Sequence, residues 1–243
     1  MVLELENVTK LYKNGRGVED ISFTLASGEV LGLLGPNGSG KTTTMKAIMG
    51  LVRPQKGTIR VCGWDALDNR EEALANVGCL IESPALYDYM TARQNLELHA
   101  RFYKDVDDAR IREVLQMVGM DMYVKDKVRS FSLGMRQRVG FAAALLSRPR
   151  LLILDEPANA LDIEGMMYVR EVIKMAAADG ASVLVSSHLA NEIQLCATKA
   201  AVIHSGRLLG MDSMDAILEE HTDLEGFFLY QVNKFRESRG YFQ

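Results

Sequence analysis

Residues 35–42 read Gly35-Pro36-Asn37-Gly38-Ser39-Gly40-Lys41-Thr42, which is a complete phosphate-binding loop. Its glycines allow successive backbone N–H groups to turn inward and cradle a polyphosphate. Lys41 adds a positive charge near the β- and γ-phosphates, and the Thr42 hydroxyl is suited to ligate Mg²⁺. The loop follows an apolar run, Val30–Leu34, and precedes a helix-like segment, Thr43–Met49, whose positive end faces the same phosphates. A glycine-rich turn that binds nothing is the alternative, but this context favours a nucleoside triphosphate site. The candidate nucleotide ligands are Gly35, Pro36, Asn37, Gly38, Ser39, Gly40, Lys41, Thr42 and Thr43.

An apolar run that ends in two acids supplies the second half of such a site: Leu151-Leu152-Ile153-Leu154-Asp155-Glu156. In phosphate-loop enzymes the first acid after such a strand holds Mg²⁺, and Asp155 has that position. Glu156 follows directly and faces the other way, so it is placed to activate an attacking water. A strand that simply ends at solvent is the alternative, and the preceding phosphate-binding loop favours the catalytic interpretation.

Composition limits the classes of protein to consider. The chain has 243 residues, 48% of them hydrophobic, and a formal net charge of −4, which argues against a nucleic-acid-binding surface. No apolar stretch approaches the length of a membrane span, and Met1–Glu6 is unlike the start of a signal peptide. The three cysteines lack C-x-x-C spacing, so we expect reduced thiols in a cytoplasmic protein, with neither a disulfide framework nor a zinc site.

The order of expected elements indicates an α/β fold with a mixed sheet. The first sixty or so residues read as strands separated by glycine-containing turns, and residues 91–147 read as helices. Asp107 and Ser132 are suited to cap two of these helices. From residue 151 onward strands and helices alternate, which implies a parallel sheet with right-handed crossovers.

A further motif, Ser132-Leu133-Gly134-Met135-Arg136-Gln137-Arg138, precedes the two acids. With the other motifs in this order, the sequence resembles the ATP-binding subunits of ABC transporters, whose signature is Ser-x-Gly-x-x-Gln/Arg at the start of a helix. The resemblance covers residues 3 to about 232 and implies a P-loop NTPase fold of the ABC cassette type. A helix N-terminus that carries Ser132 and Gly134 is suited to bind a second phosphate group. The resemblance implies that this phosphate-binding helix start completes the ATP site of a second subunit, in a head-to-tail two-fold dimer that encloses two ATP molecules.

Other family positions carry over one at a time. Tyr12 matches the aromatic residue that stacks on adenine, with Val18 packing beneath; an ordinary strand tyrosine is the alternative. Asp162 matches the loop that signals between the two sites. His188 matches the switch histidine that bonds the γ-phosphate, although a lone histidine is more often structural. These matches imply ATP and Mg²⁺ as the bound ligands.

One position departs from the family pattern. The family usually carries a glutamine that senses Mg²⁺ and the attacking water, and here the residue is Glu82. An ionised carboxylate only accepts hydrogen bonds, so Glu82 is a candidate metal ligand and catalytic residue that would repel the γ-phosphate without metal. A solvated glutamate in a shifted register is the alternative. The stretch Ile81–Tyr87 is similar to the ATPases of bacitracin-resistance and lantibiotic-immunity exporters, which also carry glutamate there.

The resemblance also sets the expected domain organisation. We expect one ABC ATPase domain over residues 1–233, with an antiparallel β part at its N-terminus. Its core comprises residues 1–83 and 148–233, and a helical lobe at about residues 84–147 is inserted into it. Residues 234–243 read as a polar, frayed tail.

These features imply an ATPase subunit that powers a membrane exporter of antimicrobial peptides or amphiphilic drugs. The expected partners are a permease, docked near residues 82–101, and a second ATPase subunit, either a copy or a homologue. The chain would then lie on the inner face of the cell membrane. The alternative is a soluble ABC-type ATPase that acts on nucleic acid or ribosomes. Such proteins carry two cassettes or long coiled-coil insertions, and neither pattern fits this sequence.

Overall fold

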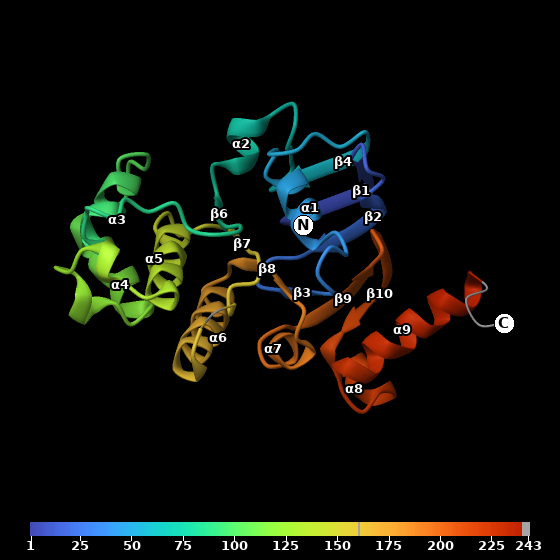
Figure 1. Ribbon diagram of the computed structural model, residues 1–243. Helices are drawn as coiled ribbons and strands as arrows, with labels where there is room; N and C mark the ends of the chain where they lie inside the picture. The colour runs from blue at the N-terminus through green and yellow to red at the C-terminus, as the bar shows by residue number, and fades with distance from the viewer. Residues whose placement is uncertain (160, 240–243) are drawn as a thin grey trace.

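Two β-sheets organise the computed structural model, which describes residues 1–159 and 161–239 (Figure 1). One sheet has the strand order β2-β1-β4-β5, and the other has the order β10-β9-β3-β8-β7-β6. The strands are β1 Leu3–Leu11, β2 Gly17–Leu25, β3 Val30–Leu34, β4 Lys56–Val61, β5 Trp64–Asp65, β6 Val77–Leu80, β7 Leu151–Leu154, β8 Ser182–Ser187, β9 Lys199–His204 and β10 Arg207–Ser213. The first sheet is antiparallel, whereas strands β6, β7, β8, β3 and β9 of the second run parallel and β10 runs antiparallel to β9. The predicted mixed sheet with an antiparallel N-terminal part is confirmed.

Helices cover both faces of the second sheet. The helices are α1 Lys41–Ile48, α2 Arg70–Leu74, α3 Ala92–Ala100, α4 Asp108–Met117, α5 Leu133–Leu145, α6 Ile163–Ala178, α7 Ala190–Gln194, α8 Met214–Glu220 and α9 Leu224–Ser238, with 3-10 turns at Asp121–Tyr123 and Val128–Ser130. Helix α1 packs between the two sheets, and α6, α7 and α9 pack on the opposite face (Figure 1). Within the described ranges, no helix combines the length and the apolar character that a membrane span needs.

Strand β3 shows why the central strands are apolar at every position. Leu31 and Leu33 pack into the core that contains α1, whereas Val30 and Leu34 pack into the core on the other face of the sheet. A parallel strand covered on both faces has no solvated side, so its side chains do not alternate between apolar and polar. Burial of each such side chain contributes about 1.5–3 kcal/mol.

The strand register brings the ends of β3, β7 and β8 to one edge of the sheet. Leu34 of β3 lies opposite Ser187 of β8, and Leu154 of β7 lies opposite Val185 of β8. Residues that follow these strands therefore lie close together at the carboxyl ends, where ligands bind in open α/β sheets.

The helical lobe stands beside the core, with α3, α4 and α5 at the left of Figure 1. The side chains of Asp107 and Ser132 cap α4 and α5, accepting hydrogen bonds from backbone N–H groups of the first turn. Arg110 of α4 is buried and donates to the carbonyl oxygens of Leu145 at 2.6 Å and Leu146 at 3.3 Å. These contacts tie α4 to the end of α5.

The C-terminal segment differs from the expectation of a frayed tail from residue 234. Helix α9 continues through Ser238, and residues 240–243 lie outside the described part of the chain. Val232 is buried, and the ring of Phe235 packs edge-on against His204 of β9 with 6.0 Å between centroids. These contacts stabilise the last turn of α9, which the polar sequence of residues 234–243 did not predict.

Candidate active site

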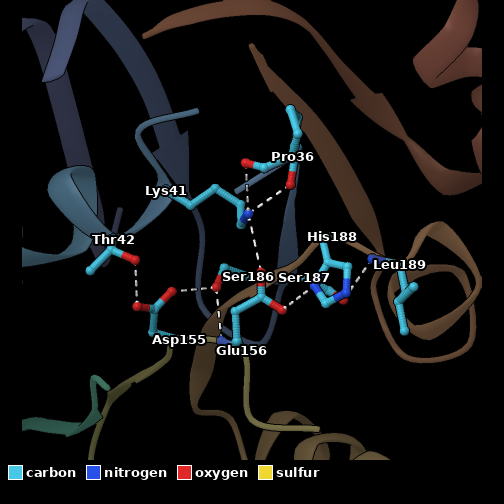
Figure 2. A network of polar contacts seen from close by, with 10 residues as sticks. Pro36, Lys41, Thr42, Asp155, Glu156, Ser186, Ser187, His188 and Leu189 are labelled. Atoms are coloured by element: carbon cyan, nitrogen blue, oxygen red, sulfur yellow. Dashed lines mark hydrogen bonds and ion pairs between the residues drawn. The ribbon is translucent and has the colours of Figure 1, made fainter. Parts of the chain in front are cut away.

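Lys41 lies at the centre of the phosphate-binding loop and is only 5% exposed. Its ammonium donates to the carbonyl oxygens of Gly35 at 2.6 Å and Pro36 at 3.3 Å, and it forms an ion pair with Glu156 Oε1 at 3.1 Å (Figure 2). A buried ammonium is stable only where oxygen atoms surround it. The carboxylate of Glu156 is therefore the counter-ion of Lys41.

The backbone of the loop has the shape of an anion cradle. Gly38 and Gly40 have φ values of +79° and +116°, a region that residues with a side chain rarely adopt. A buried hydroxyl in the same loop, Ser39 Oγ, has no hydrogen-bond partner among the described residues. A phosphate oxygen would satisfy such a donor, so the loop fits a polyphosphate.

Asp155 follows β7 and is held between two hydroxyl groups. Thr42 donates to Asp155 Oδ2 at 2.6 Å, and Ser186 donates to Asp155 Oδ1 at 2.6 Å (Figure 2). In the parts of the chain that the structure covers, no three His, Cys, Asp or Glu side chains gather as a metal cage. Mg²⁺ usually binds one or two carboxylates together with substrate phosphates and water. Thr42 and Asp155 thus fit a metal ion that arrives with a nucleotide.

Glu156 points toward His188, away from the Thr42–Asp155 pair. Its backbone has φ +49°, in the left-handed region, and its N–H donates to Ser186 Oγ at 2.9 Å. Its Oε2 lies 2.9 Å from His188 Nδ1 (Figure 2). Backbone strain of this kind occurs at functional sites where surrounding contacts hold it. The carboxylate is thus fixed between a buried cation and an imidazole.

A cavity of about 270 Å³ lies between the loop and Tyr12. The lining residues are Tyr12, Asn14, Arg16, Gly17, Asn37, Gly38, Gly40, Lys41, Thr42, Thr43 and Glu156. Tyr12 is 40% exposed, so its ring is available for stacking. Val18 is fully buried and does not line the cavity: a Cβ on Gly40 would come within 2.4 Å of its Cγ1. Val18 therefore packs beneath the loop, behind Gly40.

Three predicted residues lie away from this cavity in the same chain. Ser132 and Gly134 are at the start of α5 in the helical lobe. Asp162 caps α6, accepting a hydrogen bond from the N–H of Gly165 at 2.8 Å, and lies 3.7 Å from Arg138 Nη2.

Glu82 contacts Lys46, a residue that lies outside the motifs of the sequence. It follows β6 with φ +64°, and its carboxylate accepts a hydrogen bond from Lys46 Nζ at 2.5 Å. This hydrogen bond raises the pKa of the Lys46 ammonium above its ordinary value. Ser186 was also missed, although its place at the end of an apolar strand, just before His188, was a usable signal.

With this geometry established, comparison with known proteins identifies the family. Residues 18–159 match the family described as ABC transporter. The chain belongs to the ABC transporter ATP-binding family. This cassette is 39% identical to the uncharacterised ABC transporter ATP-binding protein YhcH of Bacillus subtilis, over 98% of this chain and 77% of that protein. It is 36% identical to the bacitracin transport ATP-binding protein BcrA of Bacillus licheniformis, over 96% and 76%. It is 35% identical to the lantibiotic transport ATP-binding protein SrtF of Streptococcus pyogenes, over 86% and 89%.

Solved structures agree with this assignment. An ATP-binding subunit of an ABC transporter superposes with a TM-score of 0.86 at 28% identity, over 96% of this cassette and all of that chain. The ATP-binding cassette MJ0796, in a dimeric post-hydrolysis state with ADP and Pi, superposes with a TM-score of 0.78 at 25% identity, over 87% and 98%. The predicted fold and family are confirmed, and the cassette is an ATPase subunit of a transporter.

Proposed function

We propose that this ATPase powers the export of an antimicrobial peptide or a related amphiphile. The observation that carries the proposal is Glu82 within Ile81–Tyr87, where the family usually has glutamine. Similarity to BcrA and SrtF along most of the chain supports it, because their names place them in bacitracin and lantibiotic transport.

The contacts of the site support a role for each residue in ATP hydrolysis. Phosphates that bind the loop would replace Glu156 as the counter-ion of Lys41 and release that carboxylate to accept a proton from the attacking water. His188, which contacts Glu156 at 2.9 Å, would bond the γ-phosphate. Thr42 and Asp155 would hold Mg²⁺, which when bound neutralises charge that develops on the phosphates.

We further propose that Ser132, Gly134 and Asp162 act on the nucleotide of a second subunit. They lie outside the cavity of their own chain, and the start of a helix, where backbone N–H groups point outward, is suited to phosphate. In this arrangement each chain contributes half of two ATP sites.

Mixing two inactive variants tests the shared site. We expect Lys41→Ala and Gly134→Asp each to be inactive alone, because each removes one half of both sites. In an equal mixture, half of the dimers would be mixed and each would keep one intact site, so activity should return to about a quarter of wild type. The rate of phosphate release measures the ATPase activity of the mixture. A mixture as inactive as its components would contradict a site shared between two copies of this chain.

The partner permease would dock beside Glu82, at the inner face of the cell membrane. Pro84 packs closely on α5, since a Cβ on Gly140 would come within 2.4 Å of Pro84 Cβ. Tyr87 and Tyr89 nearby are exposed and contact each other edge-on at 5.8 Å. Exposed aromatic residues next to the loop that joins core and lobe favour a partner at this position.

Peptide sensitivity tests the proposal directly. A sensitive host would express this chain with the permease genes that neighbour its own gene, and the matched control would carry Glu156→Gln. We expect the wild-type pair alone to raise the inhibitory concentration of bacitracin or a lantibiotic. Equal sensitivity with and without an active ATPase would contradict export of these peptides.

A further inference from the structure

We propose that Lys46 is a positioning residue that competes with Mg²⁺ for the carboxylate of Glu82. The inference deepens the proposed function and rests on it, because it takes Glu82 to act at the ATP site. In the nucleotide-free cassette Lys46 would hold this carboxylate, and binding of metal and nucleotide would draw it away.

The geometry places Lys46 on the metal-binding side of α1. Lys46 follows Thr42 by four residues, so their side chains lie on the same face of the helix. Thr42 donates to Asp155, and one turn later Lys46 donates to Glu82 at 2.5 Å. The two contacts therefore lie about one helical turn apart on the same face of α1.

Glu82 is also anchored close to Asp155 through the backbone. The N–H of Asp155 donates to the carbonyl oxygen of Leu80 at 2.8 Å, which joins the end of β6 to the start of the metal site. Glu82 is only two residues beyond Leu80, and two residues span at most about 7 Å. Its side chain is 64% exposed. Lys46 and the metal side of Asp155 thus lie within reach of the same carboxylate.

Charge decides which partner holds Glu82. A free carboxylate beside metal-free ATP would repel the γ-phosphate, and Lys46 neutralises it. A divalent cation attracts the same carboxylate more strongly than a lysine does. An exposed ion pair is weak, with an effect on an equilibrium constant of about fivefold at most, so Mg²⁺ is able to displace Lys46. The pair would thereby protect metal-free nucleotide binding and oppose premature engagement of Glu82.

The test is the metal dependence of nucleotide affinity, measured by calorimetry with a non-hydrolysable ATP analogue in excess Mg²⁺ and in EDTA. The quantity compared is the affinity with Mg²⁺ divided by the affinity in EDTA. We expect Lys46→Met to raise this ratio about two- to fivefold, because metal-free binding weakens and the metal-bound state no longer breaks an ion pair. Lys46→Arg should restore the wild-type ratio. Lys56→Met, at an exposed lysine of β4, is the matched control for loss of one positive charge.

The double variant Glu82→Gln/Lys46→Met distinguishes positioning of the Glu82 carboxylate by Lys46 from simple attraction between Lys46 and phosphate. In a Glu82→Gln background, Lys46→Met should leave the ratio unchanged, because no carboxylate remains to be held. The same increase in that background, or no increase in the single variant, would overturn the inference. If every variant binds the analogue with an equal response to Mg²⁺, only this inference fails. If the wild type binds under neither condition, the proposed function fails with it.

Discussion

Glu156→Gln is expected to abolish multiple-turnover ATP hydrolysis while ATP binding is retained. The amide has nearly the same size as the carboxylate but does not accept a proton from water, which removes a contribution of about 10²- to 10⁴-fold in rate. Binding should survive or strengthen, because Lys41 loses the competing carboxylate that lies 3.1 Å from its ammonium. Phosphate release measures turnover, and light scattering measures the dimer that should accumulate with ATP.

The matched control for this prediction is Glu171→Gln on α6, whose side chain is 67% exposed. It should hydrolyse ATP at the wild-type rate. Continued multiple turnover in Glu156→Gln would remove Glu156 as the general base. Single-turnover hydrolysis followed by arrest would instead locate the defect in a later step of the cycle.

Lys41→Ala should abolish nucleotide binding itself. The change removes the cation at the centre of the loop and leaves Glu156 as an uncompensated negative charge beside the incoming phosphates. A hydrogen bond to a charged group contributes about 1.5–3 kcal/mol, so loss of the Lys41–phosphate contact alone corresponds to a loss of affinity of about ten- to more than a hundredfold. Calorimetric titration with MgATP measures the loss.

Stabilisation by ligand gives a second measure for Lys41→Ala. MgATP should raise the melting temperature of the wild type and of a Lys56→Ala control, since a ligand that binds only the folded state stabilises it. It should leave the melting temperature of Lys41→Ala unchanged. An equal rise in all three proteins would show that Lys41 does not hold the nucleotide.

Local patterns predicted most of the fold. The run Val30–Leu34 became strand β3 at the expected boundaries, and Asp107 and Ser132 cap the expected helices. Capping and burial of an apolar run depend on residues that are close in sequence, so these features are visible without a structure. The prediction was wrong where distant contacts decide the outcome: Phe235 packs on His204 and extends α9 through Ser238.

The sequence by itself determined the chemistry of the nucleotide site, because each of its motifs is a contiguous stretch of residues. Glycines at 38 and 40 select the backbone of the loop, and Asp155 and Glu156 follow directly on a buried strand. Only the tertiary structure decided how these parts meet, including the contacts Thr42–Asp155 and Lys46–Glu82. Such contacts join residues that are far apart in the chain, and they depend on the register of parallel strands and on left-handed turns at two glutamates. No local propensity carries that information, so the pairing of Glu82 with a lysine appeared only once the strands were placed side by side.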